Sequence, residues 1–231
     1  MTPAGTPAPF SVQPIDGLVL FQDFISPEQE ADLIHNLDSR PWAGKGVPPN
    51  AELRRRTQQY GFLFSYRYRR IEEHTGGLPE FLHPVVSQIQ VLPPAPHHEY
   101  ESKSAPNFLV VNEYEVGQGI MAHTDASLFG ETIWVVSLLS SCVISFFRDD
   151  RKVDVLLPPR SLLIMSRESR FAWKHEISKQ PIDYYDDVPI ERSRRVSLTF
   201  RSVDVNGVGA TTDCRLGADP GSPGPVAGDR Q

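Results

Sequence analysis

Five side chains in the second half of the chain have the types and spacing of a metal site with an anion-binding position beside it. His123 and Asp125 are two residues apart, His175 follows, and Arg195 and Arg201 come later. In an extended segment the side chains at i and i+2 point to the same face, so His123 and Asp125 can present a nitrogen and an oxygen to one ion. Two imidazoles and one carboxylate on one face of an octahedral ion leave three positions open, which suits Fe(II) binding a keto acid and dioxygen together. The sequence therefore predicts a mononuclear Fe(II) site.

Residues 195–201 supply the anion-binding face. Period-two alternation places four polar side chains on one face of this strand-like segment and three apolar ones on the other: Arg195, Ser197, Thr199 and Arg201, opposite Val196, Leu198 and Phe200. Guanidinium groups can bind a dicarboxylate in bidentate fashion, which lysine does less well. The alternative is a solvated strand face, and the metal-binding pattern upstream favours the anion-binding interpretation.

Residues 107–203 resemble the catalytic core of the AlkB family of Fe(II)/2-oxoglutarate dioxygenases, and the N-terminal part is similar, though less specifically. The matching segments are Asn112-Glu-Tyr114, Gly117-Gln-Gly119, His123-Thr-Asp125, Arg160-Ser-Leu-Leu, Glu168-Ser-Arg170, His175 and Arg195 to Arg201. The resemblance implies Fe(II) as the cofactor, 2-oxoglutarate and O2 as co-substrates, and His123, Asp125 and His175 as the catalytic metal ligands. It also implies a double-stranded β-helix, the jelly roll of these oxygenases.

The resemblance further implies how the co-substrate is held. Asn112 and Tyr114 would hydrogen-bond 2-oxoglutarate, and their i, i+2 spacing puts both on one strand face. Arg195 would pair with the distal carboxylate. Arg201 would lie near the keto-acid end, and Ser197 belongs to the same site at a position where some relatives carry Asn.

Two positions depart from the family pattern. Arg167 precedes Glu168-Ser-Arg170 where relatives usually carry Gly, and Glu176 follows His175 where Gly is also usual. Neither is a predicted ligand, but Glu176 places a carboxylate beside the metal strand, where it can alter the local charge.

A basic, aromatic segment at about residues 50–75 resembles the nucleotide-recognition lid of AlkB relatives. Between Glu52 and Glu73 there are six arginines and three glutamates, a net charge of +3, interleaved with tyrosine and phenylalanine. Basic groups that follow phosphates, mixed with aromatics that stack on bases, are typical of single-strand binders. The predicted substrate residues are Arg54, Arg55, Arg56, Tyr60, Phe62 and Tyr66. The alternative is an amphipathic strand with solvated arginines and inward-packed aromatics.

Length and composition indicate one catalytic domain. We expect a Pro-rich disordered tail at 1–13, the dioxygenase domain at 14–205, and a disordered Gly- and Pro-rich tail at 206–231. Cys142 and Cys214 are too few for a disulfide framework, which indicates a reducing compartment. With no signal peptide and no run of about 18 apolar residues, the protein is expected in the cytoplasm or nucleus, off the membrane, as a monomer. The net charge of −6 argues against coating of nucleic acid by bulk electrostatics.

The order of elements predicts a mainly β fold with supporting helices. Residues 18–21 are expected to form a strand, and Ser26-Pro-Glu-Gln29 a capping box that opens a helix. A second helix is expected from Pro79, with Pro84 kinking or ending it. Further strands are predicted at 107–114, 131–139, 142–148, 153–157, 160–166, 170–175 and 194–203.

The leading hypothesis is oxidation of a modified base in DNA or RNA. By the resemblance, decarboxylation of 2-oxoglutarate to succinate is coupled to hydroxylation of a substrate C–H bond, and a hydroxylated N-methyl group leaves as formaldehyde. The base must leave the stack to reach the metal. Residues 117–169 also resemble eukaryotic AlkB homologues that hydroxylate modified wobble uridines of tRNA. The alternatives are an oxygenase acting on a protein side chain or a small molecule, and a non-catalytic binding module.

Overall fold

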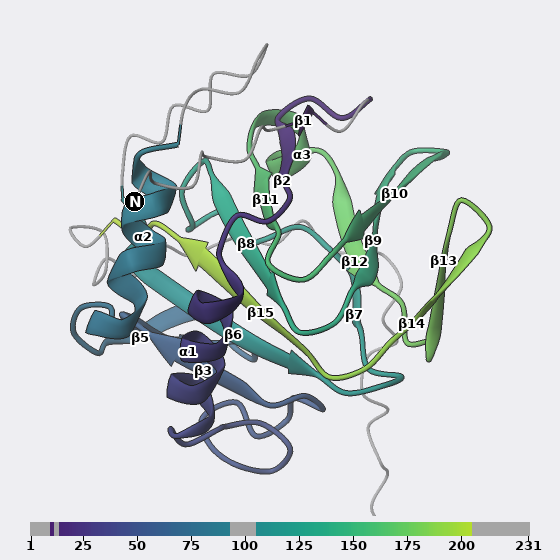
Figure 1. Cartoon of the computed structure of the whole chain (residues 1–231). Coiled ribbons are helices and arrows are strands. Elements are labelled where there is room, and N and C mark those ends of the chain that lie inside the picture. The colour runs from purple at the N-terminus through teal and green to yellow at the C-terminus, as the bar shows by residue number, and fades with distance from the viewer. Residues whose placement is uncertain (1–9, 12–13, 93–104, 205–231) are drawn as a thin grey trace, which may run out of the picture.

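Two β-sheets pack face to face in the computed structural model, and two helices cover the outer side of the larger sheet (Figure 1). The structure describes residues 10–11, 14–92 and 105–204. The arrangement is the predicted double-stranded β-helix, or jelly roll, with supporting helices, and it places the second half of the chain at the centre of both sheets.

The strands form two sheets and two separate hairpins. In spatial order the large sheet contains β1 (Phe10–Ser11), β2 (Leu18–Phe21), β11 (Leu162–Met165), β8 (Ile133–Leu138), β15 (Arg195–Arg201), β6 (Phe108–Tyr114) and β3 (Thr57–Tyr60). The small sheet contains β10 (Arg151–Leu157), β9 (Cys142–Arg148), β12 (Lys174–Ile177) and β7 (Ile120–His123). The hairpins are β4 (Phe62–Ser65) with β5 (Arg70–His74), and β13 (Ile182–Tyr185) with β14 (Val188–Glu191). The helices are α1 (Pro27–Asp38), the 3-10 turn η1 (Glu80–Leu82), α2 (His83–Gln90) and α3 (Arg167–Phe171).

Strand alternation divides the apolar side chains between two cores. On β15, Val196, Leu198 and Phe200 belong to the helix-side core, together with Leu33 and Leu37 of α1. The core between the sheets takes the opposite face of β6 and the inner face of β9, including Phe108, Val110, Ile144 and Phe146. Burial of these faces, at about 25 cal/mol per Å² of apolar surface, holds the sheets together and fixes which side chains point between them.

The helix starts follow from local chemistry. The Ser26 hydroxyl accepts from the Gln29 amide, and the Gln29 side chain accepts from the Ser26 amide, which confirms the predicted capping box. The second helix begins with η1, and Pro84 stands in the first turn of α2, where its missing N–H is not needed. Pro84 therefore neither kinks nor ends the α-helix.

The prediction for residues 170–175 was wrong. Arg167–Phe171 form the short helix α3, and the strand β12 starts only at Lys174. The Ser169 hydroxyl accepts from the Ser166 amide, a local hydrogen bond at the helix start that outweighs the aromatic, strand-like composition. No strand was predicted for β7 or the β13–β14 hairpin, and for β3, β4 and β5 a strand was only the alternative to a lid.

The predicted N-terminal tail includes one strand. Phe10–Ser11 pair with Val19 and Leu20 of β2, so the domain begins earlier than residue 14. The rest of that tail, the C-terminal tail and Cys214 lie outside the described residues. Cys142 is a buried free thiol in the core between the sheets.

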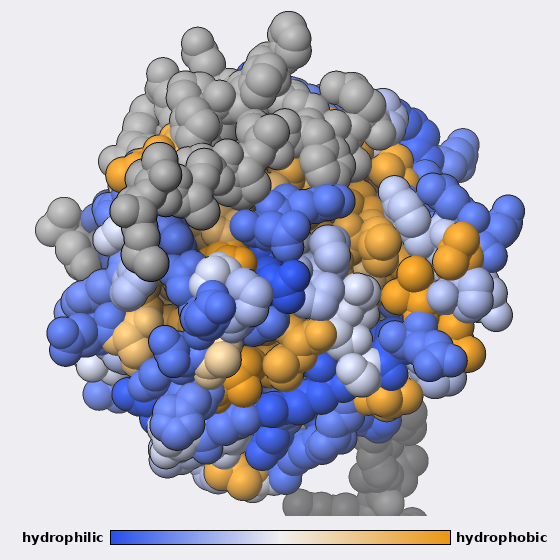
Figure 2. Space-filling view, viewed as in Figure 1, coloured by the Kyte–Doolittle hydropathy of each residue, from blue (hydrophilic) through white to orange (hydrophobic). Residues whose placement is uncertain are grey.

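One hairpin stands out at the surface. The β13–β14 hairpin projects from the small-sheet side (Figure 1), and Ile182, Tyr184 and Val188 are exposed on it. Apolar residues are visible on that side of the surface in Figure 2. Within the described residues, no helix is long and apolar enough to cross a membrane.

Candidate active site

His123 and His175 come together because β7 and β12 are neighbouring antiparallel strands. The two residues are Cα partners in the ladder, and their ring centroids are 4.4 Å apart. His175 is 9% exposed and packs against the ring of Phe146. Burial, together with the nearby His123, lowers the pKa of His175 to about 4, so its imidazole is neutral at physiological pH. A neutral imidazole is the form that ligates a metal.

A backbone hydrogen bond orients His123. Its Nδ1 lies 2.8 Å from the carbonyl oxygen of Met121. Because a carbonyl only accepts, Nδ1 carries the hydrogen in this contact, which leaves Nε2 as the nitrogen that can face a metal. This type of contact fixes the tautomer of a metal-ligating histidine.

The Asp125 carboxylate is held by Arg201. Nη2 of Arg201 lies 2.5 Å from Oδ1 of Asp125, and both groups are nearly buried. Burial alone would raise the pKa of Asp125, but Arg201 and the two histidines outweigh burial and hold that pKa well below its usual range. Among the described residues no three His, Cys, Asp or Glu side chains converge on one point. The carboxylate contacts Arg201 beside the paired imidazoles, and this donor set of two imidazoles and one carboxylate fits a divalent metal.

Arg195 lies deeper in the core between the sheets and is 1% exposed. Its Nη2 donates to Oγ of Ser137 on β8 at 2.8 Å, and its guanidinium lies 5.5 Å from the ring centroid of Tyr114. Nε and Nη1 are buried without a hydrogen-bond partner in the described part of the chain. Because an unsatisfied buried N–H is costly, these two donors fit a bound carboxylate such as that of 2-oxoglutarate.

Asn112, Tyr114 and Ser197 lie on the inner face of the large sheet, as the i, i+2 rule predicted. Ser197 pairs with Asn112 across the β15–β6 ladder, and Arg195 pairs with Tyr114. Asn112 lines the cavity, whereas Ser197 is buried and is not among the residues that line it. The cavity, of about 180 Å³, is also lined by His123, Asp125 and Arg201.

The family comparison agrees with this geometry. A sequence model of the 2OG-Fe(II) oxygenase superfamily matches residues 17–201. The chain belongs to this superfamily. Together with the relatives described next, the match places the chain in the AlkB family, so its fold and family are those of a Fe(II)- and 2-oxoglutarate-dependent dioxygenase.

Two curated relatives and one solved structure illustrate the match. The chain is 34% identical over 82% of its length to the alkylated DNA repair protein ALKBH8 homolog of Arabidopsis thaliana. It is 32% identical over 81% of its length to the tRNA (carboxymethyluridine(34)-5-O)-methyltransferase alkbh8 of Xenopus tropicalis. These matches span only 59% and 32% of the relatives' own lengths. The structure of OsALKBH1 shares the fold, with a TM-score of 0.60 at 17% identity, covering 81% of this chain and 97% of that one.

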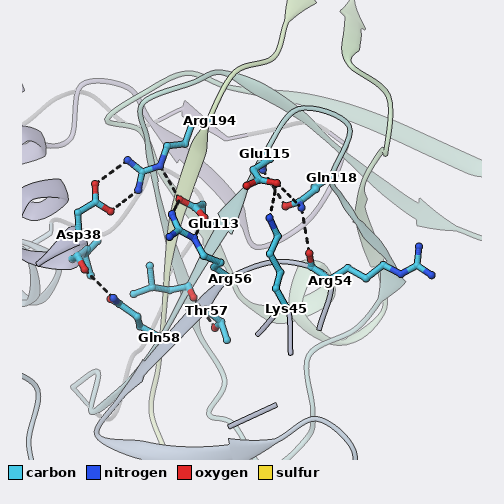
Figure 3. Close-up of polar contacts among 12 residues, drawn as sticks. Asp38, Lys45, Arg54, Arg56, Thr57, Gln58, Glu113, Glu115, Gln118 and Arg194 are labelled. Carbon is cyan, nitrogen blue, oxygen red and sulfur yellow. Dashed lines mark hydrogen bonds and ion pairs between the residues drawn. The ribbon is translucent and has the colours of Figure 1, made fainter. Parts of the chain in front are cut away.

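Some side chains of the segment at about residues 50–75 line the cavity, and others pack into the two cores. Of the predicted substrate residues, Arg55 and Tyr66 line the cavity, together with Phe64 and Arg69, which the prediction left out. The Arg54 side chain is exposed and extends away from the neighbouring contacts in Figure 3. It does not line the cavity.

Three predicted substrate residues are structural instead. Arg56 forms an ion pair with the buried carboxylate of Glu113 (Figure 3). Tyr60 packs against Phe81 on the helix side, and Phe62 is 1% exposed in the core between the sheets. For the aromatics, the inward-packing alternative is therefore correct at positions 60 and 62.

Arg170, which had no predicted role, organises the loop after β7. Arg170 is 3% exposed and donates to the backbone carbonyls of Asp125, Ala126, Phe129 and Gly130, at 2.8 to 3.3 Å. Its place in Glu168-Ser-Arg170, a matching segment without an assigned role, was the only signal. Arg170 thus fixes the backbone that carries Asp125.

The two departures from the AlkB pattern have local explanations. Arg167 has a left-handed φ of 49°, the conformation that favours glycine, and its side chain pairs with Asp16 at the surface. Glu176 alternates with His175 along β12, so its side chain lies on the opposite face of the small sheet. Neither residue lines the cavity.

Proposed function

We propose that this protein is a Fe(II)- and 2-oxoglutarate-dependent dioxygenase that demethylates or hydroxylates modified bases in DNA or RNA. The observation that carries the proposal is the pairing of His123 with His175, together with the position of His123 and Asp125 in the lining of one cavity. Nε and Nη1 of Arg195, which are buried without a partner among the described residues, support the proposed binding of 2-oxoglutarate.

In the proposed site His123, Asp125 and His175 bind Fe(II). Bound Fe(II) would supply the oxidative decarboxylation of 2-oxoglutarate by O2 and the hydroxylation of a substrate C–H bond. Burial keeps the His175 imidazole neutral, and the Met121 carbonyl orients the ring of His123.

The co-substrate is proposed to lie along the inner face of β6 and β15. Arg195 would pair with its distal carboxylate through Nε and Nη1, and Arg201 would lie at its other end beside Asp125. Asn112 and Tyr114 would hydrogen-bond it. Ser197, which is buried between Asn112 and Ser137, would support this arrangement from below.

A nucleic-acid substrate is proposed from the lid and from the relatives. The names of the Arabidopsis and Xenopus relatives assign them to alkylated DNA repair and to tRNA modification. In this chain Arg55, Tyr66 and Arg69 at the cavity combine basic and aromatic groups suited to an extruded base and its backbone. Cytoplasm or nucleus is the compartment proposed for such a substrate.

The test is turnover with defined substrates. Purified protein is incubated with Fe(II), 2-oxoglutarate, ascorbate and air, together with methylated single-stranded DNA, methylated RNA or unfractionated tRNA. Succinate and the mass of each nucleic acid are then measured. Loss of a methyl group, or gain of one oxygen on tRNA, is the expected result.

His123→Ala should abolish both products, whereas His83→Ala, at an exposed histidine far from the ladder, should not. Formation of succinate without any change in the nucleic acids would indicate that the substrate is a protein side chain or a small molecule. No succinate under any condition would contradict the enzyme assignment and favour a binding module.

A further inference from the structure

The cavity carries more positive charge than the proposed chemistry needs. Three guanidinium groups line it, those of Arg55, Arg69 and Arg201, against the single carboxylate of Asp125. Arg201 is already paired with that carboxylate. Within the described residues, no ion pair involves Arg55 or Arg69, although the chain as a whole has a net charge of −6. No carboxylate of the described residues thus pairs with these two arginines, which line the cavity of an acidic protein.

Arg55 is held in place before any ligand binds. Its Nε donates to Oδ1 of Asn112 at 2.7 Å, and its guanidinium carbon lies 5.9 and 5.8 Å from the ring centroids of Tyr66 and Tyr114. Nη1 and Nη2 of Arg55 make no hydrogen bond to the described part of the chain. These two nitrogens form the edge of the guanidinium that can donate two parallel hydrogen bonds to an oxyanion. Little side-chain entropy remains to be lost on binding.

Arg69 reaches the cavity from the β4–β5 turn. Its neighbours Arg67 and Arg70 instead lie against the exposed ring of Tyr68, at 5.6 and 5.2 Å. Arg69 has a left-handed φ of 51°, which sets it apart from the strand conformation of the hairpin. Of the three arginines in this turn, Arg69 is the one that lines the cavity.

The imbalance persists in the loaded site that the proposed function requires. In the loaded site the positive charges of a divalent metal, Arg195 and Arg201 together exceed the negative charges of Asp125 and a dicarboxylate by one. Arg55 and Arg69 raise that excess. An adenine or cytosine methylated on its base-pairing ring nitrogen carries a positive charge, and Arg55 and Arg69 would repel it. An oxyanion would be attracted.

We propose that Arg55 and Arg69 form an oxyanion-binding position, so that the substrate presents a carboxylate on the base or the phosphate beside it to these two guanidiniums. The proposal rests on the proposed function and narrows it to bases with an anionic group within reach. It assigns Arg55 and Arg69 to substrate selection and not to the reaction itself.

The experiment measures binding of short single-stranded RNA to the full chain, with and without Mn(II) and 2-oxoglutarate under nitrogen. One probe carries a central 5-carboxymethyluridine, a second has the neutral carboxamide in its place, and a third has neutral methylphosphonate linkages beside that residue. The variants are Arg55→Gln, Arg69→Gln and the charge-conserving Arg55→Lys, with Arg70→Gln as the matched control from the same turn.

We expect Arg55→Gln and Arg69→Gln each to weaken binding of the first probe by about tenfold or more, the loss of one charge-assisted contact. Arg55→Lys should recover part of the loss, and Arg70→Gln should change binding by less than about threefold. A loss of binding by the carboxamide probe identifies the base carboxylate as the ligand, and a loss by the methylphosphonate probe identifies the phosphate.

Equal binding of all three probes, or no effect of Arg55→Gln and Arg69→Gln, would overturn the proposal. A weaker affinity for 2-oxoglutarate alone in Arg55→Gln would also overturn it, because Arg55 would then belong to the co-substrate. Failure of the wild-type protein to bind Mn(II) would contradict the proposed function, whereas RNA binding by the metal-free protein still reports on the two arginines.

Discussion

Arg201 contacts Asp125 through a single carboxylate oxygen. Both Nε and Nη2 of Arg201 donate to Oδ1, at 3.2 and 2.5 Å, and no hydrogen bond from the described residues reaches Oδ2. One oxygen is thus restrained by the guanidinium, while the other remains available for a metal. The same contact keeps the Asp125 carboxylate ionised, which is the form that the proposed metal site requires.

Removal of either of two proposed ligands, Asp125 or His175, should weaken metal binding. Asp125→Ala and His175→Ala are each expected to weaken Co(II) or Mn(II) binding by at least about tenfold, because a three-residue site loses a donor. The d–d absorption of Co(II) reports this without turnover. His74→Ala, at an exposed histidine on β5, is the matched control. Unchanged affinity in His175→Ala would contradict the ligand assignment.

Replacement of the buried arginine should separate co-substrate binding from metal binding. Arg195→Lys keeps the charge but loses the planar fork, so the KM for 2-oxoglutarate should rise by about tenfold or more while Mn(II) affinity stays within about twofold. Arg194→Lys is the matched control, because Arg194 pairs with Asp38 and Glu113 on the helix side of the sheet (Figure 3). Equal KM values for both variants would exclude Arg195 from the co-substrate site.

Loss of Arg170 should loosen the loop that carries Asp125. Arg170→Met removes the hydrogen bonds to four backbone carbonyl groups and is expected to cost about 2–4 kcal/mol of unfolding free energy. Faster hydrogen exchange should appear in residues 125–130. Arg167→Met, whose side chain is exposed, controls for the loss of an arginine in α3. Unaltered exchange in that loop would show that Arg170 does not hold it.

The ion pairs of Glu113 with Arg56 and Arg194 should make the free energy of unfolding depend on pH. Burial alone would raise the pKa of Glu113, but the hydrogen bonds from Arg56 and Arg194 outweigh it and hold that pKa below 4.5. A depressed pKa in the folded state stabilises the protein above the unfolded value, and this contribution disappears as the pH falls through the folded value. Glu113→Gln should therefore lower the unfolding free energy by about 2 kcal/mol at pH 7.

Urea denaturation across pH measures this effect. The difference between wild type and Glu113→Gln should narrow steadily once the pH drops below 4.5, the ordinary value for this group. Glu115→Gln, which breaks the exposed pair with Lys45 (Figure 3), should cost less than about 1 kcal/mol at any pH. A difference that stays constant down to pH 3 would mean that the carboxylate charge is not what Arg56 and Arg194 recognise.

The sequence by itself determined the local features of this protein. Spacing of two residues put His123 beside Asp125, alternation assigned the faces of β15, and the capping box set the start of α1. Each of these depends on interactions within a few residues, which repeat regularly along a strand or helix. The family resemblance added the identity of the distant histidine and of the co-substrate arginine.

Only the tertiary structure decided how distant residues meet. Pairing of β7 with β12 brings His175 to His123. The hydrogen bonds from Arg170 to the loop after β7 join residues far apart in the sequence, so no periodic pattern predicts them. In the lid, Tyr60 and Phe62 have the spacing of one strand face but enter different cores. Gly61 separates them with a φ of 90°, and its missing Cβ lets the chain pass against the carbonyl of Asn107. Packing against β6 at that point, and not the aromatic pattern, therefore selects which lid residues reach the cavity.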